Sequence, residues 1–273
     1  MTREPGRPGR PRKQGDGPSH QGDGRGSVAA LEALGAPQTP LAPPGTQQGH
    51  FTPELFTFLG ALRAHNDRTW FAAHRERYEA YVRDPLLHFI ADFGPLLHEI
   101  SSQFVADPRP VGGSSFRIHR DTRFSKDKRP YKTNAGAQFR HCEGRDVHAP
   151  GFYLHLEPAE VFAAAGLWHP GPVELGKVRD AIVSHPETWE RVITDPTLRR
   201  THTLGGEQLT RPPRGYDPRH PFIDDLRRKD FVVSTRFSDA EVCHPDFLDR
   251  FAQACRTAAP FMRFLTEALD LPW

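Results

Sequence analysis

Aromatic side chains are missing from the first fifty residues of this chain, although its 273 residues include 19 phenylalanines, 5 tyrosines and 4 tryptophans. Glycine and proline are frequent there instead. A segment of this composition buries too little apolar surface to offset the conformational entropy lost on folding. We therefore predict that residues 1–50 form a disordered, basic tail. Residues 51–273 are numerous enough to bury a core and are predicted to form a single domain.

Cysteine and long hydrophobic runs are also scarce. The three cysteines, Cys142, Cys243 and Cys255, lie far apart and form no C-x-x-C motif, so they predict neither a disulfide framework nor a zinc site. No apolar run approaches the roughly eighteen residues of a membrane span. The residues after Met1 are charged and rich in glycine and proline, unlike a signal peptide. We expect a cytoplasmic protein without a membrane partner.

The chain has little net charge. Lysine and arginine number 36 and aspartate and glutamate 34, which gives a formal charge of +2. Such a balance offers no whole-protein argument for binding nucleic acid or membranes. The distribution is uneven, however, because seven basic and only two acidic residues lie between residues 117 and 132. This segment is therefore the first place to look for a functional site.

Apolar residues at helical spacing predict helices in the first part of the domain. Thr52 and Pro53 form a helix-start signal, and a second helix is expected over residues 70–81. A third begins at Asp84, where we expect Gly94 and Pro95 to kink or split it.

The spacing then changes to the two-residue alternation of half-buried strands. Strands are predicted at 116–119, 135–139, 152–157, 161–168 and 231–237, with helices at 173–183, 186–193 and 247–269. Consecutive strands joined by short turns must be antiparallel. We therefore predict an α+β fold in which N-terminal and C-terminal helices flank a mostly antiparallel sheet.

The basic segment carries residue types that bind anions. Arginine offers a planar fork that matches phosphate or carboxylate, and lysine offers a mobile point charge. The predicted ligand-binding residues are Arg117, Arg120, Arg123, Ser125, Lys128 and Lys132. Asp121, whose pKa the neighbouring cations should lower, would orient the arginines, and Tyr131 would act as a phenol donor. These two are the candidate catalytic residues. A plainer interpretation is a set of surface ion pairs worth less than about 1 kcal/mol each.

Several motifs resemble one known family. They are R-D-x-R-F-S-K-D-K-x-P-Y-K at 120–132, F-x-F-L-x-x-L at 56–62, N-D-R-x-W-F at 66–71, G-F-Y-L-H-L-E-P at 151–158, A-G-L-W-H-P at 165–170 and P-P-R-G-Y-D at 212–217. In these motifs, residues 51–271 or so resemble the bacterial and fungal family named domain of unknown function 2461. The resemblance implies a single-domain intracellular protein and no particular activity.

Other constellations have weaker support. His119 and Asp121 have the H-x-D spacing of two iron ligands, with His155 or His169 as a third. Those centres usually occur in barrel-like β scaffolds, so we expect no metal. His155 and Glu157 share one face of a predicted strand. They can form a base with its orienting carboxylate or, in the interpretation we prefer here, a satisfied polar pair.

Two functional hypotheses follow. In the first, an enzyme or small-molecule binder holds a phosphorylated or carboxylated ligand in the basic segment. In the second, a nucleic-acid-interacting module tracks phosphates with the same segment and the tail, while Phe124 or Tyr131 stacks on bases. We prefer the first because the basic residues are concentrated and no known nucleic-acid motif is present. A second basic stretch at 211–216 can close over the first or cover a sheet edge. The sequence indicates no cofactor and no oligomeric state.

Overall fold

The structure is a computed structural model that describes residues 49–123, 125–144 and 149–273. The described residues all fall within one compact unit. The predicted tail lies outside the described residues except for Gly49 and His50, and His50 Nε2 lies 2.8 Å from Oδ2 of Asp92. Among the helices described, none combines the length and apolar character needed to cross a membrane.

The N-terminal part of the unit is helical, as predicted, but the single helix expected over residues 70–81 is interrupted at His74. Its elements are α1 (Pro53–Ala64), α2 (Arg68–Ala73), α3 (Arg75–Tyr78), the π-helical turn η1 (Glu79–Arg83) and α4 (Asp84–Ile100). Asp67 caps α2 by accepting a hydrogen bond from the backbone N–H of Trp70 at 2.8 Å. Gly94 and Pro95 were expected to kink or split the third helix, and they do not split it, because α4 runs through both residues. Its five buried apolar side chains outweigh the one backbone hydrogen bond that proline removes.

The centre is a five-stranded antiparallel sheet, which confirms the predicted α+β class. The strands are β1 (Ala135–Arg140), β2 (Gly151–Leu156), β3 (Val161–Leu167), β4 (Thr203–Gly205) and β5 (Phe231–Phe237), in the order β1-β2-β3-β5-β4. The remaining helices are α5 (Pro172–Ser184), α6 (Pro186–Thr194), α7 (Pro196–Thr201), α8 (Ile223–Leu226), α9 (Asp239–Val242) and α10 (Phe247–Ala268). The three-residue strand β4 was not predicted, because it is too short to show alternation.

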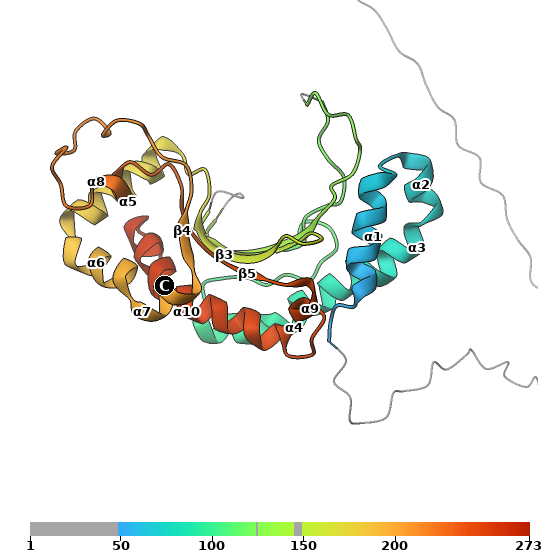
Figure 1. Ribbon diagram of the computed structural model, residues 1–273. Coiled ribbons are helices and arrows are strands. Elements are labelled where there is room, and N and C mark those ends of the chain that lie inside the picture. The colour runs from blue at the N-terminus through green and yellow to red at the C-terminus, as the bar shows by residue number, and fades with distance from the viewer. Residues whose placement is uncertain (1–48, 124, 145–148) are drawn as a thin grey trace, which may run out of the picture. The chain divides into compact units, whose positions relative to one another are not determined.

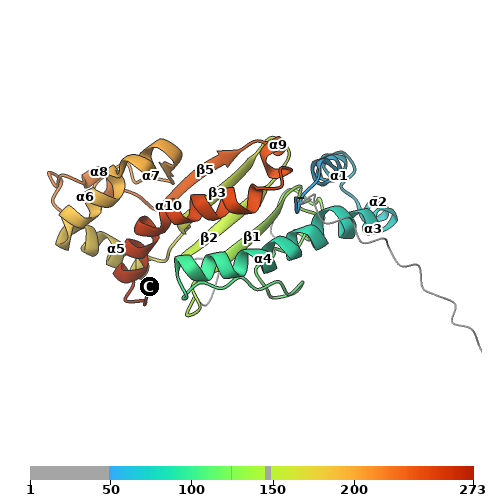
Figure 2. The same cartoon turned by 90° about the horizontal axis from the view of Figure 1, so that it is seen from below.

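One face of the sheet is covered by α4 and α10 (Figures 1 and 2). Phe139, Phe152 and Leu154 from β1 and β2 are fully buried on this face. The Phe139 ring contacts Phe93 of α4 with centroids 4.7 Å apart, and Phe93 contacts Phe251 of α10 at 4.9 Å. The hydrophobic core therefore lies between the sheet and these two helices.

The other face of the sheet is open. Its side chains come from the alternate positions of the same strands, including Tyr153, His155 and Phe162, and are only partly buried. Among the described residues, no helix lies over this face (Figure 1).

Residues 114–120 run antiparallel to residues 130–138 and form an arm that rises beside the open face (Figure 1). Lys132 N donates to Ile118 O at 2.7 Å, and Arg120 N donates to Pro130 O at 2.9 Å. The prediction of a regular strand at 116–119 was nevertheless wrong, since only isolated bridges form. Pro130 has no N–H with which to return the hydrogen bond to Arg120, so the ladder is interrupted.

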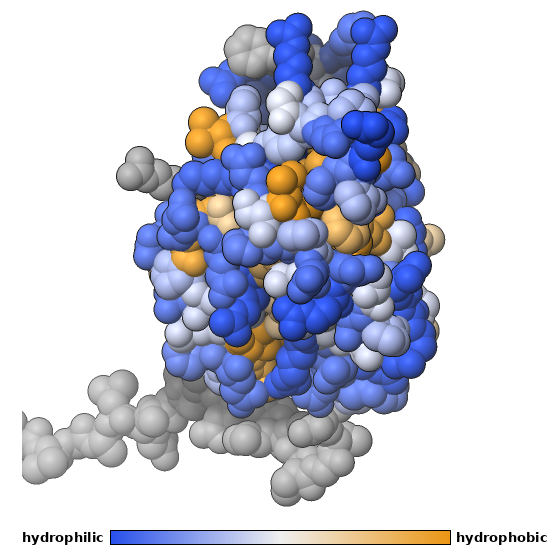
Figure 3. All heavy atoms as spheres, turned by 90° about the vertical axis from the view of Figure 1, so that its left-hand side faces the viewer, coloured by the Kyte–Doolittle hydropathy of each residue, from blue (hydrophilic) through white to orange (hydrophobic). Residues whose placement is uncertain are grey.

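The end of the unit formed by α5 to α8 presents mainly hydrophilic side chains, with separate hydrophobic spots between them (Figure 3). Val173 and Val183 of α5 are among the exposed apolar residues. Scattered exposed apolar side chains are normal for a folded protein. This end therefore does not compete with the open sheet face as a candidate site.

Candidate functional site

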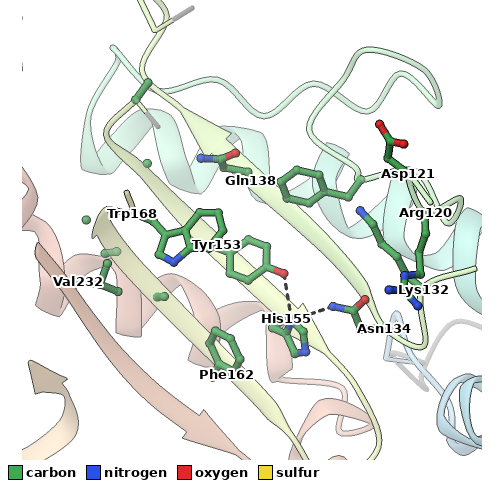
Figure 4. Close-up of a pocket in the computed structure, with 16 residues that line it drawn as sticks. Arg120, Asp121, Lys132, Asn134, Gln138, Tyr153, His155, Phe162, Trp168 and Val232 are labelled. Atoms are coloured by element: carbon green, nitrogen blue, oxygen red, sulfur yellow. Dashed lines mark hydrogen bonds between the residues drawn. The ribbon is translucent and has the colours of Figure 1, made fainter. Parts of the chain in front are cut away.

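A cavity of about 700 Å³ lies on the open face of the sheet. Its floor comes from β1, β2 and β3, and its side wall comes from the arm (Figure 4). The lining includes Phe116, Arg120, Asp121, Lys132, Asn134, Gln138, Tyr153, His155, Phe162 and Trp168. The volume and the mixture of aromatic and polar groups are typical of small-molecule sites.

Two side chains of β2, Tyr153 and His155, form a hydrogen-bonded row with Glu157, the residue that follows the strand. The Tyr153 hydroxyl lies 3.0 Å from Nδ1 of His155, and Nε2 of His155 lies 3.3 Å from Oε2 of Glu157. The alternation of the strand places all three side chains on one face. The row runs from a phenol in the cavity floor, through an imidazole, to a carboxylate.

The carboxylate fixes the tautomer of the imidazole. A carboxylate only accepts hydrogen bonds, so Nε2 of His155 carries the hydrogen that faces Glu157. In the neutral imidazole, Nδ1 is then an acceptor, and the Tyr153 hydroxyl donates to it. The side-chain nitrogen of Asn134 lies 3.2 Å from the same atom (Figure 4). His155 is therefore set up to take a proton on its Tyr153 side.

Glu157 is held by groups from two other parts of the chain. Arg63 of α1 forms an ion pair with it, and the Thr133 hydroxyl donates to Oε1 at 3.0 Å. Burial acts to raise the pKa of Glu157, but hydrogen bonds from Thr133, His155 and Arg63 outweigh it. The pKa therefore lies below its ordinary value. Glu157 is thus a carboxylate at neutral pH and supplies a negative charge next to His155.

The position of Tyr153 depends on a glycine in the neighbouring strand. Gly136 pairs with His155 in the register of β1 and β2. A Cβ atom at Gly136 would lie 2.8 Å from the Tyr153 hydroxyl oxygen and 2.9 Å from the Leu154 carbonyl oxygen. Only glycine leaves room for the hydroxyl to cross β1 at this point. Burial, followed by the negative charge of Glu157, raises the pKa of Tyr153 to about 12.

The His155 ring is also fixed by stacking. It lies on the Phe162 ring of β3, with ring centroids 4.7 Å apart and an angle of 11° between the planes. His155 and Phe162 are directly paired in the register of the two strands, where facing side chains lie close together. The imidazole therefore has little freedom to turn away from Tyr153.

The side wall of the cavity is cationic. The Lys132 ammonium lies over the Phe116 ring, 5.0 Å from its centroid, and the Phe116 ring contacts Tyr153 at 6.0 Å. Burial lowers the pKa of Lys132, and the positive charge of Arg117 lowers it further. Arg120 lines the same cavity and forms an ion pair with Asp127. The Phe116 ring of this wall therefore contacts both a partly desolvated ammonium group and the phenol in the floor.

Of the residues predicted from the sequence, Arg120, Asp121 and Lys132 line the cavity. Arg117 is exposed, and its charge acts on both Asp121 and Lys132. Asp121 forms an ion pair with Arg123 at 2.6 Å, and the hydrogen bonds from Arg123 lower its pKa to about 2. Asp121 is therefore a carboxylate at neutral pH, which suits a charge partner better than a proton donor.

The other predicted ligand-binding residues lie in the loop at the end of the arm. Ser125 Oγ accepts from Asp127 N at 3.2 Å, and Lys128 Nζ donates to Thr122 O at 2.9 Å. Both hydrogen bonds are made between residues of this loop. Neither Ser125 nor Lys128 is part of the cavity lining.

Tyr131, the other predicted catalytic residue, lies in the core. Its side chain is buried and stacks on the Phe71 ring with centroids 4.1 Å apart. The Asn66 side chain bonds to both the N–H and the carbonyl of Tyr131 at 3.0 Å. These contacts anchor the arm to α2 and to the turn before it. Tyr131 is outside the cavity lining.

Sequence reasoning did not identify Tyr153, Asn134, Phe162 or Trp168 as site residues. The signal for Tyr153 was present in the G-F-Y-L-H-L-E-P motif, because alternation places it on the same strand face as His155 and Glu157. The signal for Phe162 needed the strand register, which joins β2 to β3. In the second basic stretch, the Tyr216 hydroxyl donates to Asp180 of α5 at 2.8 Å, and none of residues 211–216 is part of the cavity lining.

Within the part of the chain that the structure describes, no group of three histidine, cysteine, aspartate or glutamate side chains is arranged to hold a metal ion. No match was found among curated proteins. The sequence profile of one family matches residues 54–264, which is most of the chain and includes the floor and side wall of the cavity. The resemblance seen in the motifs is thereby confirmed, and the chain belongs to the family described as conserved hypothetical protein (DUF2461).

Proposed function

We propose that this protein binds a small organic anion in the cavity on the open sheet face. The observation that carries the proposal is the Lys132 ammonium. It lies in the cavity lining, burial lowers its pKa, and among the described residues no carboxylate forms an ion pair with it. A partly buried charge without a counter-charge costs free energy. A phosphate or carboxylate group of a ligand would supply the missing counter-charge.

The rest of the cavity favours a ligand with an apolar or aromatic body. Phe162 and Trp168 present aromatic rings to it, whereas Arg120 and Lys132 lie on the side of the arm (Figure 4). A ligand with its anionic group at Lys132 would therefore place its body over the aromatic floor. Arg120 would contribute a second positive charge through the part of its guanidinium group that Asp127 leaves open.

The test is thermal unfolding of the full chain with phenyl phosphate, benzoate and the neutral analogue benzyl alcohol. Binding to the folded state raises the melting temperature by mass action. We expect an increase with the two anions that persists at moderate salt, and a smaller one with benzyl alcohol. Lys132→Met should abolish the increase. The matched control is Lys126→Met, which removes an exposed lysine outside the cavity lining. Equal responses of wild type and Lys132→Met would overturn the proposal.

A second candidate function uses the outside of the arm. Arg117, Lys126, Lys128 and Arg129 are exposed there, which would suit contacts to the phosphates of a nucleic acid. Such binding should weaken steeply with salt, because it releases counterions. Titration of a fluorescent single-stranded oligonucleotide at two salt concentrations separates the two functions. Lys126→Met would weaken this binding, whereas Lys132→Met would change it little.

We place this binding in the cytoplasm. Cys142, Cys243 and Cys255 are all unpaired, as is usual where thiols are kept reduced.

A further inference from the structure

We propose that Tyr153 is a catalytic acid–base residue, with His155 as its proton acceptor and Glu157 as the residue that positions His155. The inference deepens the proposed function and rests on it for one point only, the anionic nature of the substrate. The substrate would be a small carboxylate or phosphate ester that loses and regains a proton at a hydroxyl group or at a carbon next to a carbonyl.

The proton step balances within the side chains of the chain itself. As the Tyr153 oxygen takes a proton from the substrate, the Tyr153 hydroxyl passes its own proton to Nδ1 of His155, 3.0 Å away. The imidazole becomes a cation and keeps its Nε2 hydrogen bonded to Glu157. The electron pair stays on the substrate, whose new negative charge lies on the side of Lys132. The reverse step returns a proton at the same or a neighbouring atom.

The tautomer argues for this direction of transfer. With Nε2–H directed at Glu157, the Nδ1 lone pair of the neutral imidazole is shared by the phenol at 3.0 Å and the Asn134 side-chain nitrogen at 3.2 Å. Toward Tyr153, His155 can then act only as a base. Burial and Glu157 raise the pKa of Tyr153, and the phenol therefore stays protonated until a base assists it. A base held at hydrogen-bond distance supplies that assistance.

The surroundings distinguish this row from a purely structural polar network. A structural network needs its groups satisfied, but it does not need one end in a cavity. Here Tyr153 and His155 line the cavity, whereas Glu157 at the far end is held by Arg63 and Thr133. Gly136 leaves the room that the hydroxyl occupies against β1. The row is thus rigid at the carboxylate end and accessible at the phenol end, as expected for preorganised acid–base groups.

Reactivity toward an electrophile tests the row without a known substrate. A benzenesulfonyl fluoride forms an O–S bond to a tyrosine oxygen, the S–F bond breaks, fluoride leaves, and the phenol proton passes to a base. The full chain is treated with 4-(fluorosulfonyl)benzoate or with neutral benzenesulfonyl fluoride. Peptide mass spectrometry then gives the labelling rate of each tyrosine. Tyr81 is the internal reference, because it is exposed and lies in η1, outside the cavity lining.

We expect Tyr153 to be labelled at least about 10-fold faster than Tyr81, and His155→Gln to slow this labelling about 100-fold, in the range of general-base effects. Glu157→Gln should slow it less, because the hydrogen bond can persist without the charge. Added imidazole should restore labelling in His155→Gly but not in Tyr153→Phe, which no loss of packing would explain. Circular dichroism shows whether each variant is folded.

The inference is overturned if Tyr153 reacts no faster than Tyr81, or if folded His155→Gln and His155→Gly both label at the wild-type rate. The labelling rates of Tyr153 with the carboxylate probe and with the neutral probe distinguish failure of the acid–base role from failure of the proposed anion binding. Faster labelling by the carboxylate probe, lost in Lys132→Met, supports both ideas. Equal rates with the two probes, still dependent on His155, would leave the acid–base role standing and remove the anion site. Anion binding without fast labelling would make the cavity a binding site only.

Discussion

The two faces of the sheet are built from alternate residues of the same strands, yet they have different chemistry. On the face toward α4 and α10, Phe139, Phe152 and Leu154 are fully buried and contact other apolar side chains. On the open face, Tyr153 and His155 occupy the alternate positions and bond to each other. The difference shows that strand alternation separates the residues that stabilise this fold from those available for function.

The covered face should contribute far more to stability than the open one. Phe152→Ala removes a fully buried ring that contacts Phe104 at 5.2 Å and should lower the free energy of unfolding by about 3–5 kcal/mol. Phe162→Ala on the open face removes a partly buried ring and should cost about 1 kcal/mol, because solvent already reaches it. Urea unfolding of the two variants measures both values. Equal losses would show that the open face is packed in solution.

A glycine in the open face offers the next largest effect. Gly136→Ala would push against the Tyr153 hydroxyl and the Leu154 carbonyl and should cost about 1–3 kcal/mol. The control is Gly60→Ala in α1, where the added methyl group would meet no described atom within 4 Å apart from its chain neighbours and the backbone of its own helix. That substitution should stabilise the fold by about 0.5–1 kcal/mol, because alanine favours helices. Denaturant unfolding separates the two outcomes, and a neutral Gly136→Ala would contradict the close approach of Tyr153.

Alternation and helical spacing were sufficient to predict most of the secondary structure. The pattern of G-F-Y-L-H-L-E predicted β2, and antiparallel pairing followed from the short turns. The strand order and the placement of α4 and α10 on one face depend on long-range packing, which a local pattern does not contain. The continuous α4 is a related case, because burial of its apolar face overrides the local effect of Pro95.

The candidate site was only partly predictable. The concentration of basic residues at 117–132 pointed to the arm, which includes Arg120 and Lys132 of the cavity wall. The floor depends on contacts distant in sequence, such as that between Arg63 and Glu157, which are 94 residues apart. The same holds for Gly136, whose role appears only in the register of β1 with β2. Tyr131 was proposed from its basic neighbours, but its surroundings in space are Phe71 and Asn66.

The carboxylate end of the polar row should respond to pH. Because the folded pKa of Glu157 lies below its ordinary value of 4.5, its stabilising effect is complete above the unfolded pKa and is lost as the pH falls through the folded pKa. Glu157→Gln should therefore lower the melting temperature at neutral pH, and its difference from wild type should shrink in acid. The control is Glu160→Gln, which changes an exposed glutamate nearby. A difference that is the same at every pH would assign the effect to packing instead of charge.

The smallest expected effect on stability has the opposite sign. Lys132→Met keeps most of the side-chain length but removes a charge whose pKa is lowered by burial, so the ligand-free protein should melt at a slightly higher temperature. Anion binding should be lost in the same variant. A stabilising substitution that abolishes binding is typical of a residue retained for function at a cost in stability. Melting curves of wild type and Lys132→Met without ligand, at low salt, provide the comparison, with Lys126→Met as the exposed control. If Lys132→Met instead destabilised the protein, the ammonium would stabilise the fold. The main argument for an anionic ligand on the open face would then be lost.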